Sequence, residues 1–274
     1  MAETNSNISP DTTTGSGRLV IRISRRHLSF ATIGGAEGIT YSPYSLNGGI
    51  SMAANLREAL RFTDVLSTRY KKTTVMVDGN VMMVPVDFYR EDEAEALFFH
   101  AYPSEQGETV LHNVLPDLNA VALFSINKDM RGVITDYIPS AGFIAAMAPV
   151  WRYLHQRSFN GQRQKMFAYF HDGFMEVFCF SQNRFKFCNR FEVSNSSDAI
   201  FYLLYCWRQL AFQQDGDELH LVGDIPQSDA LTEELKTFIR RTYIINPSGD
   251  FNRSPVTLIS EMPYDMMTYF VKGR

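Results

Sequence analysis

Residues 165–193 read KMFAYFHDGFMEVFCFSQNRFKFCNRFEV, and this stretch decides the fold. Apolar and aromatic side chains dominate residues 165–170, 174–180 and 185–193, which predicts three successive strands. The sequence His171-Asp172-Gly173 separates the first two, and Asp-Gly is typical of a two-residue hairpin turn. We therefore expect a three-stranded antiparallel meander here.

The same order of elements occurs twice in the chain. After the meander come a predicted helix at 197–213 and a strand at 218–224, and the first half offers matching elements in the same order: strands at 18–23, 27–33 and 39–46, a helix at 51–67, and a strand at 73–77. Residue 165 lies 147 positions after residue 18. Two β-β-β-α-β units predict a duplicated α/β fold of two similar domains with a cleft between them.

The remaining sequence sets the expected domain limits. Residues 1–17 are rich in Ser, Thr, Asn and Gly, which predicts a disordered tail. We expect the first domain at 18–148 and the second at 149–274. The further expected elements are helices at 91–100, 127–137, 150–157, 231–243 and 262–271 and strands at 121–126 and 143–148. The last helix belongs to the second domain or returns to the first.

Composition is that of an ordinary globular protein, with 45% hydrophobic and 20% charged residues among 274. A net charge of -4 and a pI near 5.9 argue against nucleic acid or an anionic membrane as the main partner. The longest apolar run, residues 141–150, holds about half of the ~20 residues that a membrane-spanning helix needs, so we expect no membrane insertion. Three cysteines without a CxxC pair predict reduced thiols, no metal site and a cytoplasmic location.

A resemblance to known proteins enters at residues 121–151, VALFSINKDMRGVITDYIPSAGFIAAMAPVW. This run resembles the type IV pilus actin-like assembly protein and the bacterial cell-division actin homologue in its order of strand, Lys-led helix, AGF turn, strand and helix. The segment LVGD at 221–224 resembles the late turn that contacts adenosine in that superfamily. The resemblance covers most of 18–225 and implies an actin-like, ribonuclease-H-like fold. The chain also looks like an uncharacterised bacterial family with this fold, which implies no activity.

The resemblance implies nucleotide binding through glycine-rich hairpin turns, because only a bare backbone brings its N–H groups close to phosphate oxygens. Where the superfamily has Asp followed by Gly, this chain has Ser24, Arg25 and Arg26. The arginines either meet an anion or are solvated surface. The second hairpin keeps Asp172 and Gly173, as a remnant of a site or as a plain turn.

The third signature is also incomplete. Gly223 is present, but Asp224 stands where a second glycine is expected, and a lone glycine can simply end a strand. The candidate residues of a vestigial cleft are therefore Ser24, Arg25, Arg26, Asp172, Gly173, Gly223 and Asp224. We assign no catalytic residue, no cofactor and no metal, and we expect little or no ATP hydrolysis.

Two functions remain open. The first is a catalytically inactive cytoplasmic adaptor or scaffold that binds a protein partner or peptide, as the pilus-type relatives imply. The alternative is a divergent nucleotide-binding ATPase or switch that uses ATP and magnesium in the interdomain cleft. A ribonuclease-H-like nuclease is set aside, because the first strand offers Arg22 and no carboxylate. The aromatic residues of 167–191 form either core or a surface for a partner.

Overall fold

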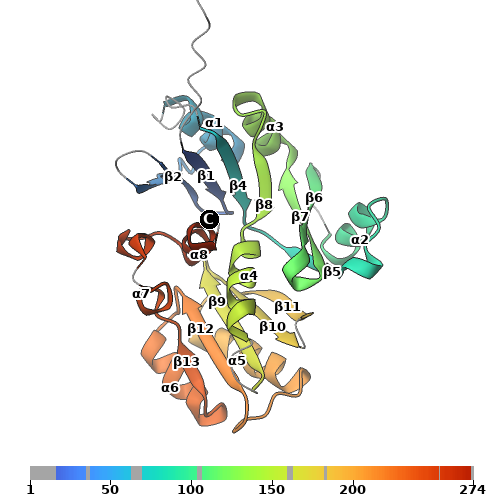
Figure 1. Ribbon diagram of the computed structural model, residues 1–274, viewed down its shortest axis with the longest axis vertical. Coiled ribbons are helices and arrows are strands. Elements are labelled where there is room, and N and C mark those ends of the chain that lie inside the picture. The colour runs from blue at the N-terminus through green and yellow to red at the C-terminus, as the bar shows by residue number, and fades with distance from the viewer. Residues whose placement is uncertain are drawn as a thin grey trace, which may run out of the picture.

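The computed structural model describes residues 17–34, 38–62, 70–103, 107–158, 163–181, 184–252 and 254–272. The expected tail, apart from its last residue, lies outside these ranges, and so does the end of the expected helix at 51–67. Figure 1 shows two lobes stacked along the long axis, each built around a sheet, with a smaller sheet beside the upper lobe.

The upper lobe contains a five-stranded sheet in the order β3-β2-β1-β4-β8. Its strands are β1 (Arg18–Ile23), β2 (Leu28–Ile33), β3 (Ile39–Tyr44), β4 (Lys72–Val77) and β8 (Gly142–Ala145). The first three form antiparallel pairs, whereas β4 runs parallel to β1 and β8 runs parallel to β4. Parallel neighbours need crossover connections. Helices α1 (Met52–Phe62) and α3 (Lys128–Tyr137) lie in these connections and pack against each other.

The lower lobe repeats this arrangement strand for strand, in the order β11-β10-β9-β12-β13. Its strands are β9 (Lys165–His171), β10 (Phe174–Ser181), β11 (Arg184–Glu192), β12 (Glu218–Gly223) and β13 (Thr242–Ile244). The crossover helices are α5 (Ser196–Gln209) and α6 (Ser228–Phe238), which pack together as α1 and α3 do. The predicted two-domain α/β fold is confirmed in its architecture, while a common origin of the two halves stays a prediction.

The alternation of side chains along β9 divides the core. Met166, Ala168 and Phe170 face the core that the lower lobe shares with α5 and α6. Phe167 and Tyr169 face the opposite way, into a larger core that continues through the upper lobe. The predicted meander therefore buries both of its faces, and most of the aromatic segment 167–191 is core, as one of its two interpretations held.

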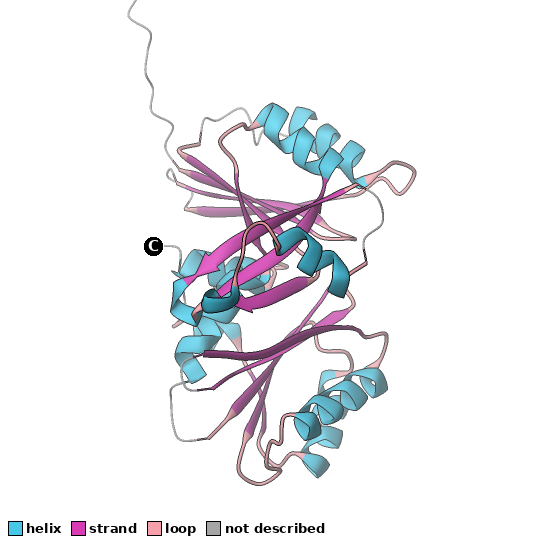
Figure 2. Cartoon of the chain, turned by 90° about the vertical axis from the view of Figure 1, so that its right-hand side faces the viewer, coloured by secondary structure: helices cyan, strands magenta, loops and turns pink. Residues whose placement is uncertain are grey.

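A third sheet, in the order β5-β7-β6, is inserted between β4 and α3 (Figure 2). It consists of β5 (Val81–Pro85), β6 (Glu108–Leu115) and β7 (Ala120–Asn127), with the 3-10 turns η2 (Val86–Phe88) and η3 (Pro116–Leu118). Helix α2 (Ala94–Ala101) covers one face through Phe98, which is buried with Val84, Val121 and Leu123. The sequence predicted only the strand at 121–126 and the helix at 91–100, so two of these three strands were missed.

Helices α4 (Met147–Ser158) and α8 (Tyr264–Lys272) pack on each other between the two large sheets. The last helix contacts the upper lobe, because the Tyr269 hydroxyl lies 2.9 Å from that of Thr74. The 148/149 boundary falls inside α4, and the domain limits 18–148 and 149–274 stay predictions. The short elements α7 (Pro247–Asp250) and η4 (Pro255–Leu258) precede α8. Among the described residues, no helix combines the length and apolar content required to cross a membrane.

Two sequence expectations are corrected here. The expected strand at 143–148 ends at Ala145, because the Ala146 N–H donates to the Val77 carbonyl at 2.8 Å and the chain enters α4 at once. The expected helix at 231–243 ends at Phe238, and Thr242–Ile244 joins the lower sheet as β13. In both places a strong helical pattern lies next to a short strand that completes a sheet.

Candidate functional site

The two predicted hairpins meet between the lobes. Ser24 accepts hydrogen bonds on Oγ from the N–H groups of His27 at 3.0 Å and Arg26 at 3.4 Å, which shapes the first turn. Asp172 and Gly173 form the second turn with positive φ values of 51° and 81°, as a tight hairpin requires. A guanidinium nitrogen of Arg26 lies 3.4 Å from the place of a Cβ on Gly173. Thus four of the predicted cleft residues face one another.

Arg22 holds three separate elements together beneath these turns. It lies on β1, is 2% exposed, and donates from Nε to both carboxylate oxygens of Asp265 on α8 at 3.0 and 2.8 Å. Its Nη2 lies 3.0 Å from Asp172 Oδ2. Burial opposes the charge on Arg22, but Asp265 and then Asp172 keep its pKa well above the ordinary value. His27 Nδ1 contacts the other oxygen of Asp172.

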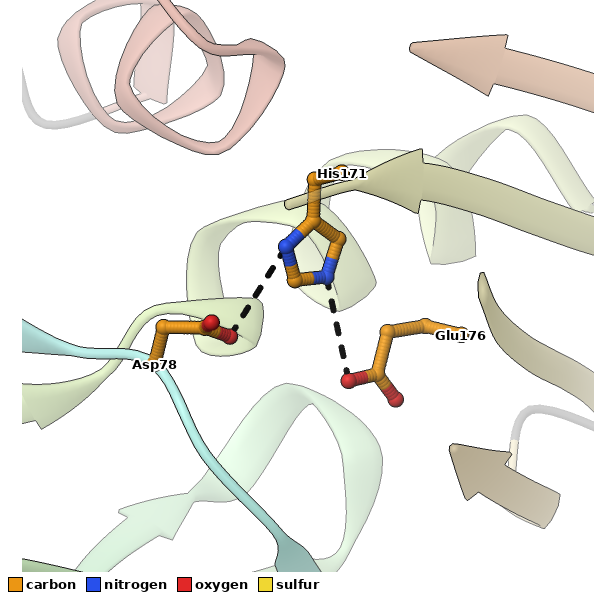
Figure 3. Close-up of side chains that lie close together, drawn as sticks. All are labelled: Asp78, His171 and Glu176. Atoms are coloured by element: carbon orange, nitrogen blue, oxygen red, sulfur yellow. Dashed lines mark ion pairs between the residues drawn. The ribbon is translucent and has the colours of Figure 1, made fainter. Parts of the chain in front are cut away.

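His171 lies at the end of β9, with a carboxylate on each side of its ring (Figure 3). Nδ1 is 3.8 Å from Asp78 Oδ1, and Nε2 is 3.8 Å from Glu176 Oε1. Asp172 Oδ2 is a third neighbour, 3.6 Å from Nδ1. Burial alone would lower the pKa of His171, but Asp172 and Glu176, together with Asp78, raise it to about 9. The ring stacks on Tyr169 with a centroid separation of 4.5 Å.

Arg190, on β11, contacts two of the carboxylates that surround His171. It donates from Nη1 and Nη2 to the two oxygens of Asp78 at 2.8 and 3.0 Å, and its Nη1 also contacts Glu176 at 3.1 Å. Its guanidinium carbon lies 3.9 Å above the Phe174 ring. Burial raises the pKa of Asp78, but His171 and Arg190 outweigh it and lower that pKa below its usual value. We call Arg22, Asp78, Asp172, His171, Glu176, Arg190 and Asp265 the interdomain ion network.

This network ties the lobes directly to each other. Arg22 and Asp78 belong to the upper sheet, while Asp172 and Arg190 belong to the lower one. Asp265 accepts from Arg22 and Asp78 accepts from Arg190, whereas Arg22 Nη2 and Asp172 Oδ2 form an ion pair at 3.0 Å without a hydrogen bond. Carboxylates facing the same space repel an anion, and each buried charge would need a new partner if the network opened.

Arg25 stands apart from the network. Its side chain is exposed and lines a cavity of about 760 Å³ between the upper lobe, the inserted sheet and β10. The opposite wall includes Phe98 of α2 and Asn127 of β7, and Asp78 and Arg190 lie at its inner end. Asp78 and Arg190 of the ion network therefore line a cavity that also reaches the exposed Arg25.

Gly223 and Asp224 follow β12 beside the hairpin. Gly223 has a φ of 93°, and a Cβ there would lie 2.1 Å from the Phe170 carbonyl oxygen, so glycine is required for packing of β12 against β9. The Asp224 N–H donates to that same carbonyl at 2.9 Å. The pKa of Asp224 is raised by burial and by the nearby charge of Asp172. Both residues have structural contacts here, and their predicted part in nucleotide binding stays a prediction.

Most members of the ion network were missed from sequence, although a signal existed. Arg22 and Glu176 each interrupt an otherwise apolar strand, in RLVIRI and FMEVFCFS. A charged residue on a buried strand must find a partner, so such interruptions mark buried ion pairs. The partner of Arg22 could not be identified this way, because Asp265 is 243 positions away along the chain.

A second concave feature lies between the upper sheet and the inserted sheet. β8 and β6 are edge strands of their sheets, and a groove of about 580 Å³ runs between them. Asn113 of β6 bridges it by donating from Nδ2 to the Phe143 carbonyl at 3.0 Å and accepting on Oδ1 from the Ala145 N–H at 2.8 Å. This amide takes up two outward backbone groups of β8. Val114 of β6 lines the groove and is 56% exposed.

The groove is basic at its rim and apolar along its floor. Its positively charged lining residues are Arg18, Lys72 and Arg152. Arg152 pairs with Asp117 at 2.8 Å. The apolar lining comes from Val114, Leu115, Phe143, Ile144, Ala148 and Pro149. A groove of this kind suits an extended segment that carries apolar and acidic side chains.

Comparison with known proteins supports the fold that was predicted. The model of a family described as a protein of unknown function, DUF3822, matches residues 5–242. A protein of unknown function with an actin-like ATPase fold from Bacteroides thetaiotaomicron is 29% identical, with a TM-score of 0.79 over 92% of this chain and 100% of that one. The PilM–PilN type IV pilus biogenesis complex contains a similar chain, with 10% identity, a TM-score of 0.53, and coverage of 93% and 96%. No curated protein matches the sequence.

Proposed function

We propose that this chain, which belongs to the DUF3822 family and has an actin-like fold, is a catalytically silent adaptor that binds an extended peptide of a partner protein. The proposal includes a cytoplasmic location. The observation that carries it is the interdomain ion network, in which Arg22 and Arg190 are paired with carboxylates where a related enzyme would need free cations. An old cleft that is closed by its own charges leaves the outer surfaces for binding.

The groove between β6 and β8 is the proposed binding surface. Extended peptides add to exposed sheet edges through backbone hydrogen bonds, and pockets beside the edge select the side chains. β6 supplies such an edge, because among the described strands only β7 pairs with it. A similar fold has been solved as a complex in PilM–PilN, which is consistent with an adaptor role. Lys72 at the rim favours an acidic side chain in the partner.

The test is a selection of peptides followed by affinity measurement. Displayed ten-residue peptides are selected on the full chain, and the winners are measured by fluorescence polarisation. Val114→Glu places a charge on the apolar wall and should weaken binding by about tenfold or more, or 1.4 kcal/mol. Phe201→Ser is the matched control, because Phe201 is an equally exposed apolar residue on α5, outside the groove.

The possible results of the peptide selection distinguish the groove from other binding surfaces. Peptides rich in apolar and acidic residues that bind wild type and the Phe201→Ser protein, but not the Val114→Glu protein, support the groove. Selected peptides that bind both variants equally well would remove the groove from the proposal. If no peptide is enriched on the folded chain, the adaptor proposal itself loses its support.

A second candidate function is a divergent nucleotide switch. The observation that favours it is the cavity of about 760 Å³ beside Ser24 and Arg25, which falls within the size range of ligand pockets. Arg25 is the basic side chain of the first hairpin that points to this space. A nucleotide there would sit beside the network instead of between the hairpins.

A further inference from the structure

The ion network carries more negative than positive charge. Four carboxylates, those of Asp78, Asp172, Glu176 and Asp265, face the two guanidinium groups of Arg22 and Arg190. Two negative charges therefore remain before the histidines are counted. Charges buried this deeply must be compensated, and the compensating cation is either a proton on His171 or a bound metal ion.

Among the described residues of the network, His171 has two buried nitrogens without a hydrogen bond, and Arg22 Nη2 and Asp172 Oδ2 are further buried atoms that lack one. It is 3% exposed, and within the described part of the chain neither ring nitrogen has a hydrogen-bond partner. Figure 3 shows the ring directed at Asp78 on one side and at Glu176 on the other. A buried imidazole usually satisfies at least one nitrogen, so two unpartnered nitrogens among carboxylates indicate an absent ligand.

We propose that Asp78, His171 and Glu176 form a site for a divalent transition-metal ion, of which Zn²⁺ is the first choice, that links the two lobes. One donor atom from each residue lies within 4.8 Å of the other two. Ligands at about 2.1 Å from a tetrahedral metal are about 3.4 Å apart. One ion binds only one ring nitrogen of His171, so the carboxylate 3.8 Å from that nitrogen needs a shift of a few tenths of an ångström, whereas the other carboxylate, within 4.8 Å, must move closer by rotation of its side chain. An imidazole with two carboxylates is a donor set that Zn²⁺ and Mn²⁺ accept.

The ligands come from both lobes, so the ion would act as a staple. Asp78 follows β4 of the upper sheet, whereas His171 and Glu176 stand on β9 and β10 of the lower one. Their side chains are 1%, 2% and 7% exposed, so an ion held by them would be shielded from bulk water. The cavity that includes Asp78 in its wall gives an ion a route to the site. The proposal does not depend on the peptide groove.

Arg190 shares two of the proposed ligands and sets the strength of the site. It contacts Asp78 Oδ1 and Glu176 Oε1, which retain further lone pairs for an ion. A second cation near these oxygens repels a metal, so the Arg190→Gln variant should bind the metal more tightly than wild type. A metal site formed by surface histidines would not bind metal more tightly in the Arg190→Gln variant.

The experiment measures thermal unfolding of the full chain, first stripped with EDTA and dialysed, with and without ZnCl₂ or MnCl₂. At a metal concentration ten times Kd, wild type should melt about 3–6 °C higher. His171→Gln and Glu176→Gln should lose the shift while retaining the far-ultraviolet circular dichroism of wild type. His220→Gln is the matched control, since His220 also faces a carboxylate, at 3.0 Å on Glu218, but lies outside the network.

Cobalt gives a second readout that does not depend on stability. Co²⁺ bound in a site of this type should produce visible absorption in wild type and His220→Gln, and none in His171→Gln. A shift that survives in both ligand variants, or the absence of any shift and any cobalt band in wild type, would overturn the proposal and leave a proton on His171 as the compensating cation. If His171→Gln does not fold, the metal-induced melting shift is compared between two other variants. Glu176→Gln should lose the shift, and Arg190→Gln should bind the metal more tightly than wild type.

Discussion

The Arg22→Met substitution tests the ion network most severely. Arg22 and Asp265 are 2% and 1% exposed, and removal of one partner leaves the other as an uncompensated buried charge. Such a loss costs about 3–5 kcal/mol of unfolding free energy. For a chain of this size, 1 kcal/mol corresponds to about 2–4 °C in melting temperature, so we expect a decrease of about 6–20 °C.

The double variant Arg22→Met with Asp265→Leu supplies the control. Replacing both charges by apolar groups of similar size removes the uncompensated carboxylate, so it should recover at least half of the lost stability. The assay is guanidinium unfolding followed by circular dichroism, with the midpoint compared among wild type, both single variants and the double variant. A loss below about 1 kcal/mol for Arg22→Met, or a double variant with the summed loss of the two single variants, would refute the reasoning.

Three further predictions concern other parts of the fold. Asn113→Ala removes two hydrogen bonds to the β8 backbone and should cost about 1–3 kcal/mol in chemical unfolding, whereas a loss below that range would show that water replaces the amide. Gly223→Ala puts a Cβ 2.1 Å from the Phe170 oxygen and should lower the melting temperature by several degrees, about 1–3 kcal/mol; an unchanged melting temperature would contradict the packing argument. Burial lowers the pKa of His220, with Glu218 opposing, so the unfolded chain takes up the proton first and stability should fall as pH drops below about 6.5. His220→Gln should flatten that part of the pH profile, and an identical profile would exclude His220 as its cause.

The strands of the two large sheets, apart from β13, could be predicted because each is marked by its local sequence. In β1 and β9, nearly every residue is buried and most are apolar, and the turns between strands contain Asp-Gly or consecutive polar residues. The inserted sheet could not be predicted in the same way. β6, with the sequence ETVLHNVL, is mostly half-buried and carries His112 and Asn113 among its apolar residues, so its alternation is weak.

The hairpin residues of the candidate site came from the resemblance to the actin-like superfamily together with the positions of the predicted turns, and the structure places Arg26 of the first turn beside Gly173 of the second. Most of the residues that fill the space between the hairpins were not predicted from the sequence. Their pairings join Arg22 to Asp265 and Asp78 to Arg190 over long distances in sequence, and one sequence carries no record of such contacts. The sequence does indicate that a charged residue inside an apolar strand requires a partner of opposite charge.

The central claim is that the ion network leaves no place for phosphates between the hairpins. Calorimetric titration of the full chain with ATP or ADP and magnesium tests it directly, together with an assay for released phosphate. We predict no saturable heat up to about 1 mM nucleotide, which bounds any binding near -4 kcal/mol, and no turnover. Saturable binding with Kd below about 100 µM that persists in an Arg25→Ala variant, whose changed side chain lines the cavity beside the network, or turnover that an Asp172→Ala variant loses, would contradict the claim and make the chain a nucleotide-dependent protein.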